Sequence, residues 1–192
     1  MDDTERTNAE ITGILEQYIH GKDDDRYPLL EEIYDQEALL SFSVRTAGIT
    51  FPERIEGNRE IARVLSADFN TKYKEVRTYY LAPVSACRIS LAVTAQPWLV
   101  LMRERTGGLL KVGCGLYDWH FCQAPDSSQQ IRSHRITIAE MIDLPDQSDQ
   151  LLAHLQQQLP YPWTDRQTVV SLLARYEELS DLVRYLQNQP HK

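Results

Sequence analysis

Apolar residues near the N-terminus recur with the period of an α-helix. One face of this predicted helix carries Ile11, Ile14, Leu15, Tyr18 and Ile19, spaced i, i+3, i+4, i+7 and i+8. Residues 7–10 have the sequence of a capping box at its start, and Gly21 is a suitable C-cap. A second, short amphipathic helix begins at Pro28. The acidic run at 23–25 between the two helices is predicted to be a solvated turn.

After residue 70 the pattern changes to alternation of apolar and polar residues, which is typical of strands. Strands are predicted at residues 38–44, 75–81, 98–105, 109–122 and 131–142, with a further short candidate at 49–51. Turn sequences at 106–108 and 124–128 join the last three as two successive hairpins. The stretch from Cys87 to Val93 is open to two readings, a further strand or a loop. The pattern therefore predicts an antiparallel meander.

Helices are predicted on both sides of this meander. Gly57 precedes a third helix, for which Asn58 is a natural N-cap. Near the C-terminus, a helix at 151–159 is followed by a proline-containing break, and a capping box at 164–167 starts one long helix that extends to Leu186. Helices laid across an antiparallel sheet define an α+β fold class. Such an arrangement leaves a funnel that suits a small-molecule ligand.

Charge and composition narrow the range of partners. The 192-residue chain has 20 basic and 28 acidic residues and a formal net charge of -8, which argues against nucleic acid as a partner because phosphate contacts need basic surfaces. No apolar run approaches the roughly 20 residues of a membrane span, so no membrane partner is expected. The acidic N-terminus does not have the pattern of a signal peptide.

The cysteines indicate the cellular compartment, and the absence of known motifs bears on whether a cofactor or metal is bound. Cys87, Cys114 and Cys122 are odd in number and have no CxxC spacing, so neither a disulfide framework nor a zinc site is expected. Reduced thiols are typical of a cytoplasmic protein. The sequence has no phosphate-binding glycine loop, no nucleophile elbow and no HExxH motif. We therefore expect neither a cofactor nor a metal.

Three stretches resemble one protein family in their order and spacing. They are ILEQYIHGKDDDRYPLLEEIYDQEALLSFSV, IEGNREIARVL and GGLLKVGCGLYDWHF. Together they resemble the nuclear transport factor 2-like superfamily, in particular its SnoaL-like branch, over roughly residues 8–142. The resemblance implies a cystatin-like cone, a curved antiparallel sheet closed by N-terminal helices, and often a homodimer formed through the outer face of the sheet. Residues 1–145 would form this domain, and residues 146–192 a helical extension packed on it or on a partner subunit.

The family does not settle the activity, because its members dehydrate, isomerise, hydrolyse epoxides, cyclise or do not catalyse at all. Two positions depart from its patterns. The early strand ALLSFSV contains no acid, so the general base of ketosteroid-isomerase-type members has no counterpart there. His134 stands in the final strand where many members have tryptophan.

Candidate chemistry concentrates on the strand at 109–122. Alternation places Cys114, Asp118 and His120 on one face, which we interpret as the inner one, and glycines and aromatic residues on the other. The hairpin brings His134 near position 117 or 118, and a slip of one residue would turn it to the opposite face. If the two side chains pair, Asp118 orients His134 for proton transfer. A structural ion pair for Asp118 and a core role for His134 are the alternatives.

The remaining candidates are tyrosines. By the resemblance, Tyr18 would extend into the cone and donate a hydrogen bond, with core packing as the alternative. The predicted ligand-binding residues are Tyr34, Tyr80, Cys114 and His120. Two functions remain open at this point. One is binding of a small, largely apolar oxygenated molecule, with cofactor-free dehydration, isomerisation or cyclisation by Asp118, His134 and Tyr18. The other is a non-catalytic binding or dimerisation module.

Overall fold

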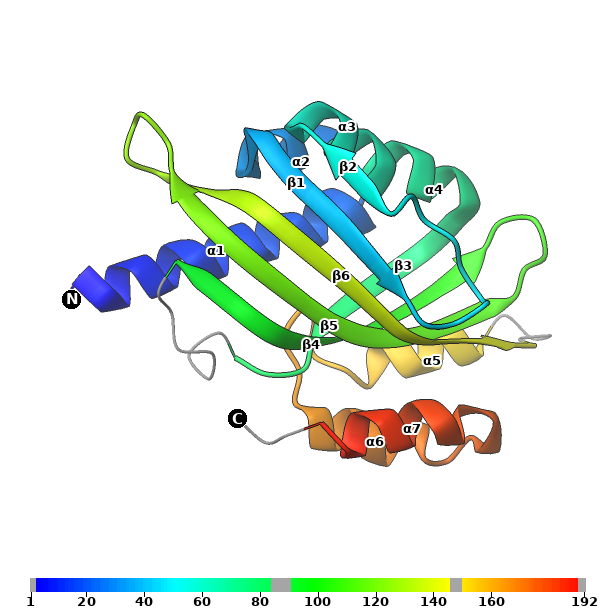
Figure 1. The fold of residues 1–192 in the computed structure, drawn as a ribbon. Coiled ribbons are helices and arrows are strands. Elements are labelled where there is room, and N and C mark those ends of the chain that lie inside the picture. The colour runs from blue at the N-terminus through cyan, green and yellow to red at the C-terminus, as the bar shows by residue number, and fades with distance from the viewer. Residues whose placement is uncertain (1–2, 84–90, 146–149, 190–192) are drawn as a thin grey trace.

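The computed structural model describes residues 3–83, 91–145 and 150–189. The helices are α1 (Asp3–Asp23), α2 (Tyr27–Ile33), α3 (Asn58–Ala62), the π-helical η1 (Arg63–Asp68), α4 (Phe69–Lys72), α5 (Leu151–Gln157), α6 (Arg166–Leu173), the 3-10 helix η3 (Glu177–Leu179) and α7 (Ser180–Gln187). The strands are β1 (Tyr34–Val44), β2 (Arg54–Glu56), β3 (Tyr73–Tyr80), β4 (Ala92–Glu104), β5 (Leu110–Gln123) and β6 (Gln129–Leu144). These elements form an α+β fold (Figure 1), which confirms the predicted class.

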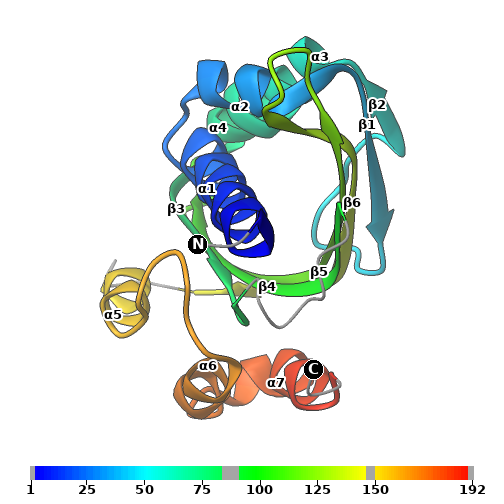
Figure 2. The same cartoon turned by 90° about the vertical axis from the view of Figure 1, so that its left-hand side faces the viewer.

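The strands form one curved, six-stranded sheet in the order β2-β1-β6-β5-β4-β3. Successive strands from β3 to β6 pair antiparallel, as the two predicted hairpins require, whereas β1 pairs parallel to β6. Figure 2 shows the sheet curling around α1, with α2 and the continuous stretch α3–η1–α4 covering the gap between β3 and β1. Apolar side chains from these helices and the inner face of the sheet make one core.

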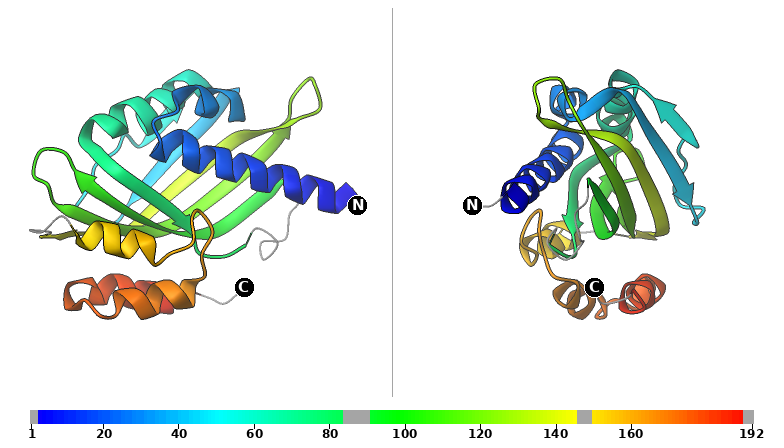
Figure 3. Two further views of the ribbon diagram at one scale, coloured as in Figure 1. Left: turned by 180° about the vertical axis from the view of Figure 1, so that it is seen from behind. Right: turned by 60° about the vertical axis from the view of Figure 1, so that its left-hand side comes forward.

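The C-terminal helices cover the outer face of the same sheet. Leu99, Leu101, Val112 and Cys114 on that face join a second buried cluster with residues of α5, α6 and α7. Figure 3 shows α5, α6 and α7 together on this side of the sheet, where α5 contacts β4 and α7 contacts β5 and β6. The chain therefore buries both faces of β4 and β5 by itself, because apolar surface on each face has its own helical partner. A homodimer remains a prediction.

The segment that joins α5 to α6 attaches the extension to the cone. Tyr80 N donates to Pro162 O at 2.8 Å, and Thr164 N donates to Tyr80 O at 3.0 Å, so the segment pairs with the edge of β3. Trp163 Nε1 donates to Glu16 Oε1 on α1 at 2.7 Å. These contacts satisfy backbone groups that the edge strand would otherwise expose.

Several boundaries differ from the sequence-based predictions. The first helix begins at Asp3 rather than at the predicted capping box, and Gly21 lies inside it. The short strand is β2, beyond Pro52, and not residues 49–51. Residues 87–90 of the undecided stretch lie outside the described residues, and its last two, Ala92 and Val93, belong to β4.

The single long C-terminal helix was also a wrong prediction. Tyr176 has an extended backbone (φ -116°, ψ 112°) and separates α6 from the η3–α7 stretch. The reversal lets Val169 and Leu173 of α6 and Leu182 and Leu186 of α7 all pack into the same outer cluster. A straight helix would carry half of this stripe beyond the sheet. No helix in the described part of the chain has the length and apolar character to cross a membrane.

Candidate functional site

The register of β5 against β6 decides which side chains enter the cone. Trp119 lies opposite His134, and Tyr117 lies opposite Ile136. The rings of Trp119 and His134 stack, with centroids 3.5 Å apart and planes at 14°. The inner face of β5 is therefore its aromatic one, and the neighbouring positions point outward because side chains alternate along a strand.

The predicted inner face was wrong for three residues. Asp118 lies opposite Arg135, not His134, and its Oδ1 accepts a hydrogen bond from Ala95 N at 2.8 Å. His120 is exposed, with Nδ1 3.2 Å from Ser133 Oγ. Cys114 is buried in the outer cluster. The predicted Asp118–His134 pair does not form, because each side chain lies on a different face of the sheet. A catalytic role for either residue remains a prediction.

His134 and Tyr34 form a polar pair inside the core. The Tyr34 hydroxyl lies 2.7 Å from His134 Nδ1, and both side chains are buried. Burial lowers the pKa of His134 well below its usual value, so the imidazole is neutral. Burial also raises the pKa of Tyr34, with the neighbouring Tyr117 adding to the effect. The ring shares this one hydrogen bond with Tyr34 through Nδ1, and Nε2 has no partner among the described residues.

The predicted tyrosine sites divide between core and cavity. Tyr80 is buried, donates to Leu15 O at 3.0 Å and packs on Trp163. Neither Tyr34 nor Tyr80 is among the residues that line the inner cavity, whereas Tyr18 is. One edge of Tyr18 contacts the rings of Trp119 and His134. Burial, together with Tyr117, Tyr34 and Tyr80, raises its pKa well above the usual value, so its hydroxyl is a hydrogen-bond donor.

The cavity lies beyond Tyr18, toward α4, and has a volume of about 40 Å³. Its wall is mostly apolar and consists of Phe42, Ile49, Phe51, Leu65, Phe69, Val100, Met102, Ile136 and Met141. The polar lining residues are Tyr18, Lys22, Thr78, Trp98 and Tyr117. The Tyr18 hydroxyl and Trp98 Nε1 are both buried and have no partner at hydrogen-bond distance among the described residues, although the Tyr117 hydroxyl lies near enough to affect the pKa of Tyr18. Unpaired buried donors of this kind are rare, and each is a candidate contact for a ligand.

Lys22 is the cation of this cavity and is only 6% exposed. Its Nζ donates to Thr78 Oγ1 at 2.7 Å and to Asp23 Oδ1, and it lies 5.1 Å from the centre of the Phe69 ring. An ammonium group has three N–H donors, so one remains for a ligand after these two bonds. Lys22 thus combines a fixed position with a free donor in a mostly apolar space.

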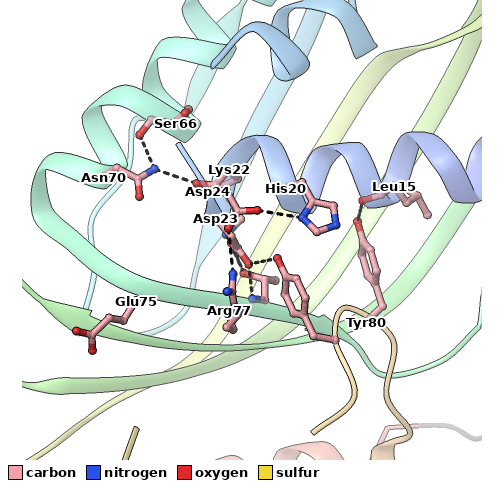
Figure 4. A network of polar contacts seen from close by, with 12 residues as sticks. Leu15, His20, Lys22, Asp23, Asp24, Ser66, Asn70, Glu75, Arg77 and Tyr80 are labelled. Carbon is pink, nitrogen blue, oxygen red and sulfur yellow. Dashed lines mark hydrogen bonds and ion pairs between the residues drawn. The ribbon is translucent and has the colours of Figure 1, made fainter. Parts of the chain in front are cut away.

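Asp23 compensates this buried charge. Its Oδ2 accepts from Thr78 N at 2.5 Å and from the Tyr161 hydroxyl at 3.2 Å, and its Oδ1 accepts from Thr78 Oγ1 at 3.0 Å (Figure 4). The solvated turn was a correct prediction for Asp24 and Asp25, which are exposed, and wrong for Asp23, which is 7% exposed. Both carboxylate oxygens of Asp23 therefore have hydrogen-bond donors within the protein.

A second layer surrounds Asp23 nearer to solvent. Asp24 Oδ2 lies 3.1 Å from His20 Nδ1, and its Oδ1 accepts from Arg77 at 3.0 Å (Figure 4). Partial burial would raise the pKa of Asp24, but the hydrogen bonds from His20 and Arg77 outweigh it and lower the pKa. Arg77 also lies over the Tyr161 ring, 4.7 Å from its centre. The connecting segment is thereby tied to the end of α1.

Larger depressions open to the surface, and two of them bear on the predicted residues or adjoin the inner cavity. One, of about 420 Å³, lies between residues 49–56 and the stretch α3–η1–α4. The other, of about 390 Å³, is on the outer face of the sheet and includes Asp118, His120, Ser133 and Arg135. No group of three or more His, Cys, Asp or Glu side chains in the described ranges is placed to hold a metal ion.

The comparison with solved structures finds proteins similar to this chain, whereas the two comparisons by sequence do not. Neither a protein-family model nor a curated protein sequence matches the chain. Solved structures do match. A nuclear transport factor 2-like superfamily protein from Salmonella enterica is 13% identical, with a TM-score of 0.57 over 76% of this chain and 96% of that one.

Two further matches are named as enzymes. A putative scytalone dehydratase from Novosphingobium aromaticivorans is 13% identical, with a TM-score of 0.59 over 77% of this chain and 94% of the other. The hexachlorocyclohexane dehydrochlorinase LinA-type3 from Novosphingobium barchaimii is 13% identical, with a TM-score of 0.59 over 72% and 90%. This chain has the nuclear transport factor 2-like fold. At these identities the likeness shows the fold alone, so the function has to be argued from the side chains of this chain.

Proposed function

We propose that the protein binds a small, largely apolar molecule that carries a hydrogen-bond-accepting oxygen, in the cavity bounded by Tyr18, Lys22 and Trp98. The observation that supports this most directly is the pair of buried, unpartnered donors, the Tyr18 hydroxyl and Trp98 Nε1. Lys22 contributes a third donor to the same apolar wall. A ligand with an accepting oxygen satisfies groups that otherwise stay unpaired, and an apolar body fits the rest.

The donor set also distinguishes binding from catalysis. Within the described residues the cavity lining has no carboxylate and no histidine side chain, since Asp23 lies behind Lys22 and His134 behind Tyr18. Proton abstraction needs a base within about 3 Å of the reacting group. The residues that line the cavity therefore favour ligand binding over catalysis by dehydration, isomerisation or cyclisation. The fold likeness to enzymes supports a small-molecule site but does not require turnover.

The binding test uses phenol, with toluene as the matched ligand that lacks the oxygen, in titrations followed by amide NMR shifts. We expect phenol to bind more tightly than toluene in the wild type. Tyr18→Phe should weaken phenol binding about tenfold, the scale of one lost hydrogen bond, without changing toluene binding. The control is Tyr79→Phe, because Tyr79 also has a buried, unpartnered hydroxyl but belongs to the outer cluster.

Two results would contradict the proposal. Equal effects of Tyr18→Phe and Tyr79→Phe on phenol binding would place the site elsewhere. Shifts confined to residues outside the cavity lining would do the same. Catalysis is tested separately with cyclohexanone in deuterated buffer. Exchange of its α protons above the buffer rate, lost in Tyr18→Phe, would favour the enzyme reading over binding alone.

A further inference from the structure

The 420 Å³ groove and the inner cavity are neighbours that share part of their lining. The groove is floored by apolar residues and lined at its rim by charged ones, and three residues, Ile49, Phe51 and Phe69, line both compartments. Figure 1 shows the chain from β1 to β2 passing beside α4, where these residues originate. Movement of a single side chain at this point would connect groove and cavity.

Phe51 occupies the boundary in a stack of three rings. Its ring is parallel to that of Phe42, with centroids 4.4 Å apart and an interplanar angle of 2°. On the other side, the Phe69 ring lies at 6.5 Å and 15°. Phe51 is only partly buried, whereas Phe69 is buried. Phe51 therefore has one aromatic neighbour from β1 and one from α4, and it lines both compartments.

The backbone that carries Phe51 is held at its ends and not in the middle. Phe42 N donates to Glu53 O at 3.0 Å, and Gly48 N donates to Thr46 Oγ1 at 3.4 Å. No hydrogen bond to another described residue fixes the main chain of residues 49–52. A segment without backbone hydrogen bonds opens at low cost, because only side-chain packing resists the movement.

The size of the cavity requires such a movement if the ligand contains a ring. A dry cavity of about 150 Å³ holds one benzene molecule. The inner cavity of about 40 Å³ is far smaller, whereas the groove of about 420 Å³ lies in the range of ordinary ligand sites. A ring next to Tyr18 and Lys22 therefore has to displace a lining side chain, and Phe51 is the least buried of the three that the cavity shares with the groove.

We propose that groove and cavity form one binding site closed by Phe51, and that its ligand is a planar ring compound. On binding, the ring displaces Phe51 into the groove and takes its place between Phe42 and Phe69, with an oxygen directed to Lys22. This rests on the proposed function and adds the shape of the ligand, the path of entry and the residue that controls it. The new arrangement keeps the stacking with Phe42 and Phe69, because one aromatic ring replaces another.

The charges at the rim limit the polar end of the ligand. Arg54 pairs with Glu56 at 2.7 Å, and Arg63 pairs with both Glu60 and Asp68. Lys72 is exposed and has no ion pair among the described residues. The rim thus carries three cations and three anions, so the donor that selects an accepting oxygen in the ligand is Lys22 in the inner cavity.

The first test measures access without any ligand. Met102 and Met141 line the cavity, so their oxidation by dilute hydrogen peroxide, followed by mass spectrometry of peptides, reports entry. We expect Phe51→Ala to speed this oxidation at least fivefold and Phe51→Trp to slow it. Leu91→Ala is the control, because Leu91 is 49% exposed and lines neither compartment. Unchanged rates in both Phe51 variants would overturn the closing role of Phe51.

The second test uses 2-naphthol as the probe in stopped-flow fluorescence with the full chain. Phe51→Ala should raise the association rate about tenfold, Phe51→Trp should lower it, and Tyr18→Phe should raise the dissociation rate. Binding that responds to Tyr18→Phe and not to either Phe51 variant would leave the proposed function standing and refute this inference. No binding of 2-naphthol to the wild type or to Phe51→Ala, together with phenol binding that neither Phe51 variant changes, would refute this inference and leave the proposed function standing.

Discussion

The hydroxyl of Tyr34 lies 2.7 Å from Nδ1 of His134, although the two residues are 100 positions apart in the chain. Trp119 covers one face of the imidazole, and Tyr18 contacts its edge. The pair is enclosed in the aromatic core, which keeps the ring neutral because a charged imidazole would lose its hydration there.

We expect this enclosure to make stability depend on pH. The pKa of His134 is lowered by burial in the folded protein, whereas in the unfolded chain it is about 6.5. Below about pH 6.5 the unfolded state therefore binds the extra proton, so stability falls as the pH falls, by at most about 1.4 kcal/mol per pH unit. Urea unfolding at pH 5, 6 and 7 should show a smaller loss in His134→Gln than in the wild type. His120→Gln, at the exposed histidine, should leave the pH dependence unchanged, and an equal effect would contradict the explanation.

Removal of the Asp23 charge should strongly destabilise the fold. In Asp23→Asn the ammonium of Lys22 stays buried without its carboxylate, and an uncompensated buried charge costs about 3–5 kcal/mol. Asp24→Asn is the control, because Asp24 is exposed and its loss should cost less than about 1 kcal/mol. Urea unfolding of the two variants at pH 7 measures the difference. Similar costs would show that Asp23 does not compensate Lys22.

The connecting segment should support the cavity through Tyr161. Tyr161→Phe removes one donor from Asp23, and we expect a loss of about 1–3 kcal/mol, the range for a hydrogen bond to a charged group. Tyr176→Phe serves as the matched control, because Tyr176 also belongs to the C-terminal extension and lies in the outer cluster. The readouts are urea unfolding and the Nζ resonance of Lys22. If the Lys22 resonance does not move in Tyr161→Phe, the segment has no influence on the cavity.

Two glycine substitutions should act in opposite directions. A Cβ added at Gly115 would lie 1.8 Å from Thr137 O and 2.9 Å from the Trp98 ring, so Gly115→Ala forces β5 and β6 apart and should cost about 3 kcal/mol or more. A Cβ at Gly13, within α1, meets nothing within 4 Å. Gly13→Ala should stabilise the protein by about 0.5–1 kcal/mol, because alanine favours the helix. Thermal unfolding compares both, and a destabilising Gly13→Ala would contradict the open space at that position.

The sequence predicts the sheet better than the contents of the cone. Period-two alternation and two turn sequences are local signals, and they are sufficient for β3 to β6 and the two hairpins. The inner face of β5 was misassigned because both faces are apolar. Val112 and Cys114 pack under the C-terminal helices, while Tyr117 and Trp119 pack on α1. An alternating pattern cannot distinguish two covered faces.

The polar site was missed for a different reason. Asp23 looks like part of a solvated acidic turn because most of its hydrogen-bond partners lie far away in the sequence, and Lys22 was not singled out at all. Their partners are Thr78, 55 positions beyond Asp23, and Tyr161, 138 positions beyond it. Burial of these charges depends on contacts that only the folded chain makes. The one useful local signal is Lys22 itself, which continues the apolar face of α1 after Ile19.

The parallel pairing of β1 with β6 has a consequence for synthesis on the ribosome. β6 is the last strand to be made, yet it lies in the middle of the sheet and joins β1 and β2 to the β3–β5 meander. A nascent chain that ends before Gln129 therefore has two halves with open strand edges and no common core. Such contacts between distant parts of the sequence form slowly, and exposed edges favour aggregation. We expect productive folding to begin only after β6 has left the exit tunnel, and the newborn chain to depend on chaperones until then.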